Sequence, residues 1–177
     1  MKKLEEYVRS IPDFPEPGII FRDVTDVTTI LKDADGLHLA IDQILDMLKD
    51  VDFDVVVGPE SRGFIFGVPV AYNMKKAFVP VRKKGKLPCE TVSMEYDLEY
   101  GSAVIEMHKD SIKPGQKVVI IDDLIATGGT IEAITKLVEQ LGGEVVKIVF
   151  LMELAGLEGR KKLAKYDVDS VICYEGK

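Results

Sequence analysis

The chain has 177 residues, of which 46% are hydrophobic and 30% are charged, and its formal net charge is −7. This length and composition predict one compact globular domain over residues 1–177. The acidic balance argues against a protein that mainly binds nucleic acid, because phosphate backbones are bound through an excess of Lys and Arg. A local basic pocket for a small phosphorylated ligand is compatible with it.

Cysteine and histidine are scarce, with two residues of each. Cys89 and Cys173 lack CxxC spacing, which predicts two free thiols in a reducing compartment. His38 and His108 are too scattered to suggest a zinc site. The first residues are charged, without the apolar stretch of a signal peptide, and no apolar run approaches the roughly 20 residues that span a bilayer. We therefore expect a cytoplasmic protein without a membrane partner.

The N-terminal third shows two helical patterns separated by a proline-rich loop. Apolar residues recur every three to four positions from Leu4 to Ile11, which predicts a short amphipathic helix that ends at Pro12. Residues 12–18 contain three prolines and are expected to form a rigid loop. A second apolar stripe, from Leu37 to Leu48, predicts a longer helix with Asp33 or Asp35 as its cap.

From residue 55 onward, short apolar runs alternate with helical patterns. Strands are predicted at residues 55–57, 77–81, 118–121, 145–151 and 169–173, and helices at residues 64–72, 131–141 and 157–165. Pro69 is expected to limit or kink the first of these helices. Strands that alternate with helices predict an α/β fold with a central, mainly parallel sheet flanked by helices.

Residues 82–107 interrupt this alternation. The segment is rich in charge and contains two strand-like stretches, residues 91–95 and 102–107. In the second stretch Ala103, Ile105 and Met107 alternate with period two, so we predict a β-hairpin, or flap, beside the sheet. A long polar excursion inside a compact domain is usually functional or disordered.

The most informative segment is residues 118–130, where a buried apolar strand is followed by two aspartates and a Thr-Gly-Gly-Thr sequence. Asp122 and Asp123 are expected at the C-terminal end of the strand, where ligands of open α/β sheets bind and where the turning chain lets both face one ligand. Carboxylates are unsuited to holding phosphate. They accept hydrogen bonds from the vicinal hydroxyls of a sugar or approach a cation.

The glycines and threonines that follow are suited to an anion. Glycines let backbone N–H groups crowd around a phosphate, threonine hydroxyls add donors, and a helix N-terminus favours negative charge. Together the two elements predict a ribose 5-phosphate site. The plainer alternative is a tight strand–helix turn with a capping Thr and two solvated aspartates, which the complete string of residues disfavours. Neither the P-loop nor the GxGxxG pattern is present in it.

This string resembles the 5-phosphoribosyl 1-pyrophosphate motif of type I phosphoribosyltransferases. Residues 14–23, 58–64, 82–88 and 96–101 are similar, in that order, to segments of the adenine phosphoribosyltransferase family. The resemblance implies a single-domain type I phosphoribosyltransferase fold with an N-terminal base-binding hood at residues 1–32 and a basic loop and flexible flap at residues 82–107. The implied reaction, part of purine salvage, transfers the 5-phosphoribosyl group to N9 of adenine and yields AMP and pyrophosphate.

The resemblance also implies roles for individual residues. It assigns the ribose 5-phosphate to Ala126, Thr127, Gly128, Gly129 and Thr130, and the ribose hydroxyls to Asp122 and Asp123, whose negative field would also favour a developing cation at C1. It assigns pyrophosphate to Ser61, Arg62, Arg82 and Lys86, and adenine to Ile20, Phe21, Arg22 and Arg62. Tyr100 would close as a lid over the reacting centre, and Glu99 would exchange a proton with the purine. Mg²⁺ is expected to be carried mainly by the substrate rather than by direct protein ligands, and the protein is expected to be a homodimer.

Plainer interpretations stay open for several of these residues. The basic loop can be a solvated turn, Ile20 and Phe21 can be core residues, and Glu99 can be a surface carboxylate. Residues 26–28 read as an insertion relative to the family, close to the base-recognition loop.

Two other functions stay open as well: transfer to xanthine or another 6-oxopurine, and non-catalytic sensing of 5-phosphoribosyl 1-pyrophosphate. A sensor typically adds a DNA-binding domain or basic surface, for which this acidic chain has no room. The basic loop and the flap also favour turnover. A ribose-phosphate diphosphokinase would need an ATP site and a longer chain.

Overall fold

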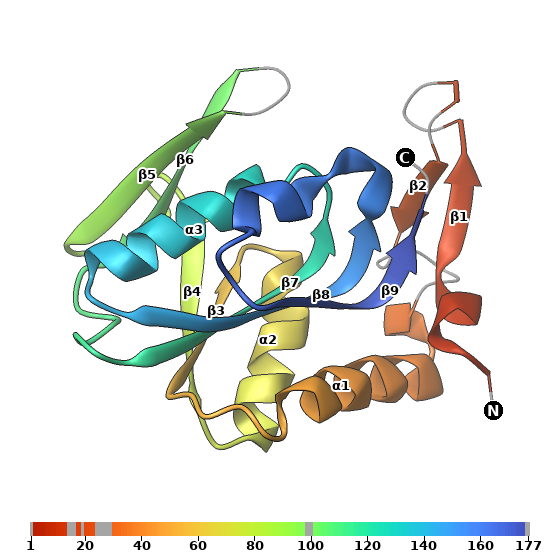
Figure 1. Cartoon of the computed structure of the whole chain (residues 1–177), viewed down its shortest axis with the longest axis horizontal. Helices are drawn as coiled ribbons and strands as arrows, with labels where there is room; N and C mark the ends of the chain where they lie inside the picture. The colour runs from red at the N-terminus through yellow and green to blue at the C-terminus, as the bar shows by residue number, and fades with distance from the viewer. Residues whose placement is uncertain (1, 14–16, 19, 24–29, 98–100, 176–177) are drawn as a thin grey trace.

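The computed structural model describes residues 2–13, 17–18, 20–23, 30–97 and 101–175, and at residues 10 and 20–23 it describes the backbone alone. Its centre is a seven-stranded sheet in the order β5-β6-β4-β3-β7-β8-β9 (Figure 1). Five neighbouring strands are parallel: β4 (Ala77–Lys83), β3 (Val55–Pro59), β7 (Lys117–Ile125), β8 (Glu144–Leu154) and β9 (Val168–Tyr174). The predicted mainly parallel α/β sheet is therefore confirmed.

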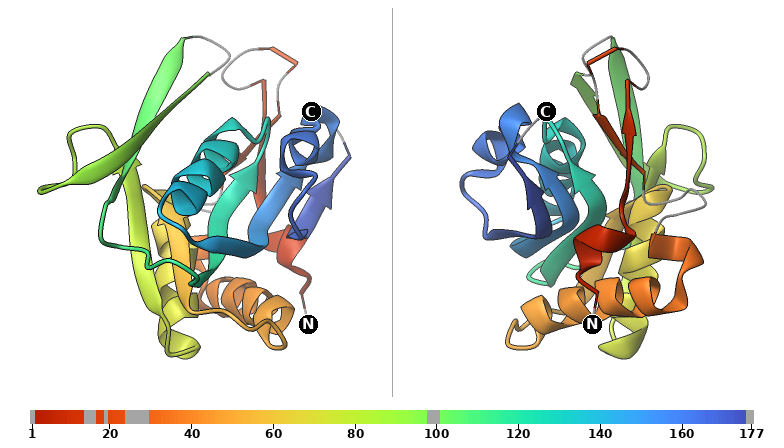
Figure 2. Two further views of the ribbon diagram at one scale, coloured as in Figure 1. Left: turned by 60° about the vertical axis from the view of Figure 1, so that its left-hand side comes forward. Right: turned by 90° about the vertical axis from the view of Figure 1, so that its right-hand side faces the viewer.

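Helices cover both faces of the sheet (Figures 1 and 2). On β3, Val55 and Val57 pack into a cluster that includes residues of α3 (Gly129–Gln140). Val56, between them, packs into the cluster that includes residues of α1 (Ala34–Leu48) and α2 (Arg62–Asn73). Because neighbouring strand residues point to opposite faces, each strand contributes to both halves of the core.

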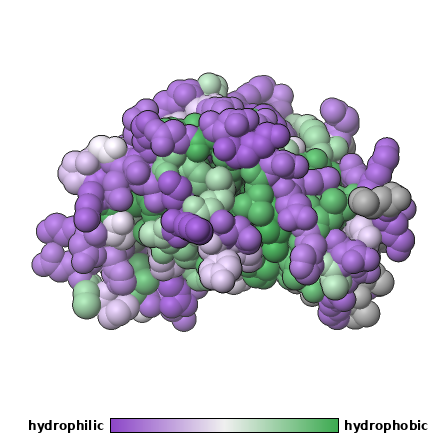
Figure 3. Space-filling view, turned by 90° about the horizontal axis from the view of Figure 1, so that it is seen from below, coloured by the Kyte–Doolittle hydropathy of each residue, from purple (hydrophilic) through white to green (hydrophobic). Residues whose placement is uncertain are grey.

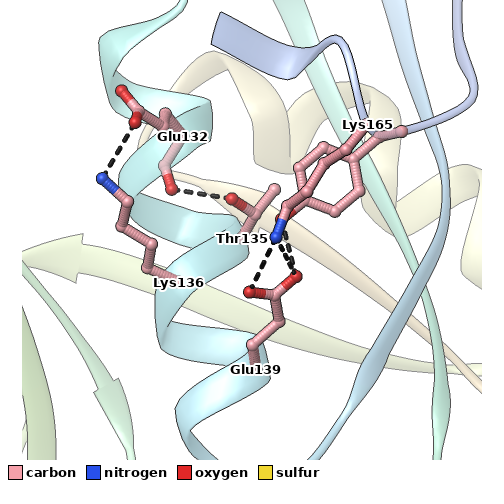
Figure 4. Close-up of polar contacts among 6 residues, drawn as sticks. Glu132, Thr135, Lys136, Glu139 and Lys165 are labelled. Atoms are coloured by element: carbon pink, nitrogen blue, oxygen red, sulfur yellow. Dashed lines mark hydrogen bonds and ion pairs between the residues drawn. The ribbon is translucent and has the colours of Figure 1, made fainter.

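The helix ends follow the local sequence closely. Asp33 caps α1, since its carboxylate accepts hydrogen bonds from the N–H groups of Asp35 and Gly36, each at 3.0 Å. The predicted helix at residues 64–72 is α2, which continues past Pro69 to Asn73. On the outer face of α3, Lys136 pairs with Glu132 at 2.8 Å and Lys165 reaches Glu139 at 3.0 Å (Figure 4).

Two predicted helices are wrong. The N-terminal one is a single 3-10 turn, η1 (Leu4–Tyr7), followed by β1 (Arg9–Pro12), which pairs antiparallel with β2 (Ile20–Asp23). This pairing partner lies across the proline-rich loop, so local periodicity does not reveal it. The predicted helix at residues 157–165 is two 3-10 turns, η3 (Ala155–Leu157) and η4 (Gly159–Leu163), because Glu158 between them has φ +56°. A further 3-10 turn, η2 (Ile30–Lys32), precedes α1.

The predicted hairpin is confirmed, and it is part of the main sheet rather than beside it. Strands β5 (Thr91–Asp97) and β6 (Ser102–His108) pair antiparallel along their whole length. β6 also pairs antiparallel with the end of β4, where Arg82 lies opposite Glu106. The hairpin thus forms one edge of the sheet and projects beyond the helices in Figure 1.

Cys89 and Cys173 are both exposed, and both are free, as predicted. In the part of the chain that the structure describes, no helix is long and apolar enough to cross a membrane. Within the same residues, no group of three His, Cys, Asp or Glu side chains gathers as a candidate metal site.

Candidate active site

The two predicted site aspartates lie inside β7 rather than beyond its end. The strand continues to Ile125 because β8 keeps pairing with it as far as the Ile125–Glu153 position. The two carboxylates nevertheless come together at the start of α2. The Asp123 Oδ2 atom lies 2.9 Å from Nε of Arg62, and a β-carbon added at Gly63 would lie 3.1 Å from Oδ1 of Asp122.

Asp123 is buried and incompletely satisfied. The residue is 4% exposed, and its Oδ2 atom accepts no hydrogen bond from the residues that the structure describes, although the Arg62 charge is close. Burial raises the pKa of both carboxyls, and most strongly that of Asp122, which also faces the charge of Asp123. A buried acceptor without a donor is expected to be completed by a ligand or water. A sugar hydroxyl is a donor of the right kind.

The raised pKa of Asp122 leads to a stability prediction. Above that pKa the ionised carboxylate is unfavourably buried, so its contribution to stability is greatest at acid pH and is lost as the pH rises through the folded-state value. Asn keeps the Oδ1 atom that accepts the N–H of Asp123 at 2.9 Å, but it carries no charge. We therefore expect Asp122→Asn to raise Tm at neutral and alkaline pH, with the difference shrinking towards acid pH.

Thermal denaturation across this pH range checks the prediction. The matched control is Asp52→Asn, because the Asp52 side chain is 84% exposed and pairs with Lys117 at the surface. That variant should have nearly the Tm of the parent. A parent protein more stable than Asp122→Asn at neutral pH would contradict the account.

The start of α3 forms a small polar pocket after β7. A cavity of about 120 Å³ is lined by the site segment, namely Asp122 and residues 124–131. Gly128, which has φ +77°, directly precedes α3, and no side chain caps the N-terminus of this helix. The Thr130 hydroxyl donates to the Tyr96 hydroxyl of β5 at 3.3 Å. Uncapped backbone N–H groups at a helix start, with a threonine hydroxyl beside them, favour an anion such as phosphate.

A second group of charged residues lies at the ends of β3 and β4. Arg82 donates to one Glu60 oxygen from Nε at 3.1 Å and from Nη2 at 3.0 Å, and its Nη1 donates to the Lys86 carbonyl at 3.2 Å. The Lys83 N–H donates to the other Glu60 oxygen at 2.6 Å. Burial alone would raise the pKa of Glu60, but the Lys83 N–H and the Arg82 guanidinium lower it.

Comparison with known proteins decides the family. The family model of the phosphoribosyl transferase domain matches residues 26–175. An adenine phosphoribosyltransferase of Lachnoclostridium phytofermentans is 79% identical over the full length of both chains, and one of Agathobacter rectalis is 67% identical over the same extent. The chain belongs to the adenine phosphoribosyltransferase family. Its activity is accordingly that of a pentosyltransferase, as the sequence motifs predicted.

Solved structures of adenine phosphoribosyltransferases share this fold. The enzyme of Thermoanaerobacter pseudethanolicus matches with a TM-score of 0.90 at 53% identity, over 97% of this chain and all of that one. The enzyme of Saccharomyces cerevisiae, complexed with adenine and an imino-altritol bisphosphate, matches with a TM-score of 0.87 at 40% identity. That match covers 95% of this chain and 96% of the yeast chain. The predicted type I phosphoribosyltransferase fold is confirmed.

The structure brings together some of the residues that the adenine phosphoribosyltransferase motifs single out. Arg62 pairs with Asp123, and the adjacent Asp122 lines the pocket of the 126–130 turn, while Arg82 binds Glu60 and donates to the Lys86 carbonyl. Residues 60–62 connect the two groups, since Glu60 contacts one and Arg62 the other. Ser61 lies exposed between them as the residue before α2.

Other predicted residues are not placed. Ile20, Phe21 and Arg22 lie in β2, and their side chains are outside the described part of the chain. Glu99 and Tyr100, and the insertion at residues 26–28, lie outside the described residues altogether.

Sequence reasoning missed two residues that the adenine phosphoribosyltransferase fold brings to the site. Glu60 was identifiable as an acid directly after a strand, but its partner Arg82 is 22 positions away. Gly159 packs against the 126–128 turn, and no local pattern connects it with that turn.

Proposed function

We propose that this chain transfers the 5-phosphoribosyl group of 5-phosphoribosyl 1-pyrophosphate to N9 of adenine, where β7 leads into α3. The observation that carries the proposal is the buried carboxylate of Asp123, whose Oδ2 atom has the Arg62 charge beside it but accepts no hydrogen bond from the described residues, in the strand that leads to an uncapped helix start. The first feature suits a ribose hydroxyl and the second suits the 5-phosphate. The two features stand a few residues apart, as the parts of one ribose 5-phosphate require.

Asp122 and Asp123 act on the ribose in this proposal. They orient the sugar through its hydroxyls, and their negative field favours the positive charge that develops at C1 as the bond to pyrophosphate breaks. Arg62 holds Asp123 in place, and its partly exposed guanidinium is available to the diphosphate or to a ring nitrogen of the base. Ala126, Thr127, Gly128, Gly129 and Thr130 bind the 5-phosphate.

The leaving diphosphate is assigned to Ser61, Arg62, Arg82 and Lys86. Glu60 fixes the Arg82 guanidinium through two hydrogen bonds, which reduces the side-chain freedom lost on binding. The carboxylate oxygens of Asp122 and Asp123 are hard metal ligands. They are therefore compatible with a phosphoribosyl substrate that brings Mg²⁺ into the site. When bound, Mg²⁺ supplies neutralising charge to the departing diphosphate.

Adenine is assigned to Ile20, Phe21 and Arg22, with a backbone carbonyl near Ile20 accepting from the exocyclic amine. The β5–β6 hairpin serves as the lid, carrying Tyr100 over the reacting centre and Glu99 as the group that exchanges a proton with the purine. The Thr130–Tyr96 hydrogen bond supports this, because it joins the hairpin to the 126–130 turn. A closed lid excludes water from the reaction.

A homodimer is part of the proposal. Tyr72 is 83% exposed and Val68 is 47% exposed, both on α2, and hydrophobic residues show between hydrophilic ones when the molecule is seen from below (Figure 3). A second copy would cover such residues. We further assign residues 1–177 to one domain and the protein to the cytoplasm, which its two free cysteines support.

Incubation with Mg²⁺ and 5-phosphoribosyl 1-pyrophosphate, with adenine, hypoxanthine, guanine and xanthine offered separately, tests the proposal. AMP from adenine alone, abolished by EDTA, is the expected result. Nucleotide from a 6-oxopurine instead would keep the phosphoribosyl site and overturn the assignment of the base. No product from any base, with 5-phosphoribosyl 1-pyrophosphate still bound, would make the protein a sensor.

A further inference from the structure

The turn at residues 158–160 supports the proposed phosphate turn from behind. A β-carbon added at Gly128 would lie 2.6 Å from the Gly159 carbonyl oxygen, and one added at Gly159 would collide with the carbonyl oxygen of Ala126. The two turns therefore touch backbone to backbone. Any displacement of Gly159 has to be transmitted to Ala126 and Gly128.

Arg160, the next residue, fastens this turn to the sheet. Its Nε and Nη2 atoms each donate to a different oxygen of Glu153 at 2.7 Å, and Nη2 also lies 3.2 Å from the Ser170 hydroxyl. Its Nη1 atom donates to the Val168 carbonyl at 2.5 Å. Such a bidentate pair fixes the guanidinium in orientation as well as in position.

Glu153 is a rigid anchor for this contact. It is 6% exposed, lies on β8 opposite Ile125 of β7, and also accepts a hydrogen bond from the Ser170 hydroxyl at 2.6 Å. The Arg160 hydrogen bonds lower the pKa of Glu153, so the carboxylate stays ionised. Ile125 directly precedes the phosphate turn. The Arg160–Glu153 pair, called the clamp below, thus connects Gly159 to β8 opposite Ile125. Residues 126–130 start directly after Ile125.

We propose that Arg160 is a positioning residue for the phosphoribosyl donor: by its bidentate pair with Glu153 it holds Gly159 against residues 126–128 and so sets the shape of the turn that receives the 5-phosphate. This rests on the proposed function, because it takes residues 126–130 as the phosphate site. Arg160 itself touches no substrate atom in this account.

Arg160→Met keeps the length of the side chain and removes the clamp. We expect the KM for 5-phosphoribosyl 1-pyrophosphate and the Kd for ribose 5-phosphate, measured by calorimetry, to rise about tenfold, since small displacements in a binding site are costly. The KM for adenine and kcat should change much less. A purely structural role would instead lower Tm and the amount of active enzyme while leaving both KM values unchanged.

Three further variants separate positioning from charge. Arg160→Lys keeps the positive charge but not the fork of donors, so it should lose as much affinity as Arg160→Met. Glu153→Gln should reproduce the effect, and combining it with Arg160→Met should add little, because both remove one interaction. Lys161→Met is the matched control, since Lys161 pairs with Glu158 at the surface, where the two side chains are 72% and 61% exposed. It removes an equal charge from the residue next to this turn and should bind ribose 5-phosphate as the parent does.

Parental affinity in Arg160→Lys, or equal losses in Arg160→Met and Lys161→Met, would overturn the positioning role, because either result would make the effect one of charge. The variant Thr127→Ala distinguishes failure of the positioning role of Arg160 from failure of the assignment of residues 126–130 to the phosphate. If Thr127→Ala weakens ribose 5-phosphate binding and Arg160→Met does not, the phosphate site stands and the clamp is irrelevant to it. If neither variant weakens binding, the assignment of residues 126–130 to the phosphate is itself wrong.

Discussion

Replacing Asp123 by Asn is expected to lower kcat/KM for AMP formation by about a hundredfold or more, the usual cost of removing one preorganised electrostatic contact from a transition state. The substitution changes the shape of the side chain very little. It removes the buried negative charge that pairs with Arg62 at 2.9 Å and that is available to a sugar hydroxyl in the site. Steady-state kinetics with adenine and 5-phosphoribosyl 1-pyrophosphate measure the effect.

Asp52→Asn is the control for Asp123→Asn. It also removes one carboxylate charge, but from a surface pair with Lys117, so kcat/KM should stay at the parental value. If Asp123→Asn were as active as the parent, the buried carboxylate would be a structural feature of β7, and the ribose would have to be held elsewhere.

Gly128→Ala is expected to be the second severe substitution, with the KM for 5-phosphoribosyl 1-pyrophosphate raised about a hundredfold. Two costs combine at this position. The residue has φ +77°, which disfavours any side chain, and the new β-carbon would lie 2.6 Å from the backbone oxygen of Gly159. The backbone oxygen cannot rotate away as a side chain would, so the turn itself has to move.

Gly115→Ala separates these two costs. Gly115 has φ +83°, but a β-carbon there would meet nothing within 4 Å. It should lose about 1–2 kcal/mol of stability from the left-handed conformation alone and keep the parental KM values. Equal KM values for Gly128→Ala and the parent would show that the phosphate does not depend on the shape of this turn.

The parts of the fold that could be predicted from the sequence are those that local pattern determines. The β-branched run at residues 55–57 predicts a buried strand from local sequence alone. The apolar stripe from Leu37 to Leu48 predicts a helix in the same way. The site segment at residues 118–130 is likewise continuous in sequence, so its strand, its carboxylates and its helix start could be recognised together.

The predictions that are wrong or missing concern contacts between residues distant in sequence. Local periodicity predicts a helix that includes residues 9–11 of β1, because the antiparallel partner of this strand, β2, lies beyond the proline-rich loop. The extension of β7 through Asp122 and Asp123 depends on continued pairing with β8. The contact of Glu60 with Arg82 and that of Gly159 with residues 126–128 are likewise tertiary. No local periodicity carries information about such contacts, since they are set by how the elements pack.

A crystal structure of the complex with AMP tests the central claim most directly. We expect phosphate oxygens within about 2.7–3.2 Å of the backbone N–H groups and hydroxyls of residues 127–130, and ribose hydroxyls that donate to Asp122 and Asp123. A phosphate seated instead on Arg82 and Lys86, with no sugar hydroxyl at Oδ2 of Asp123, would contradict it.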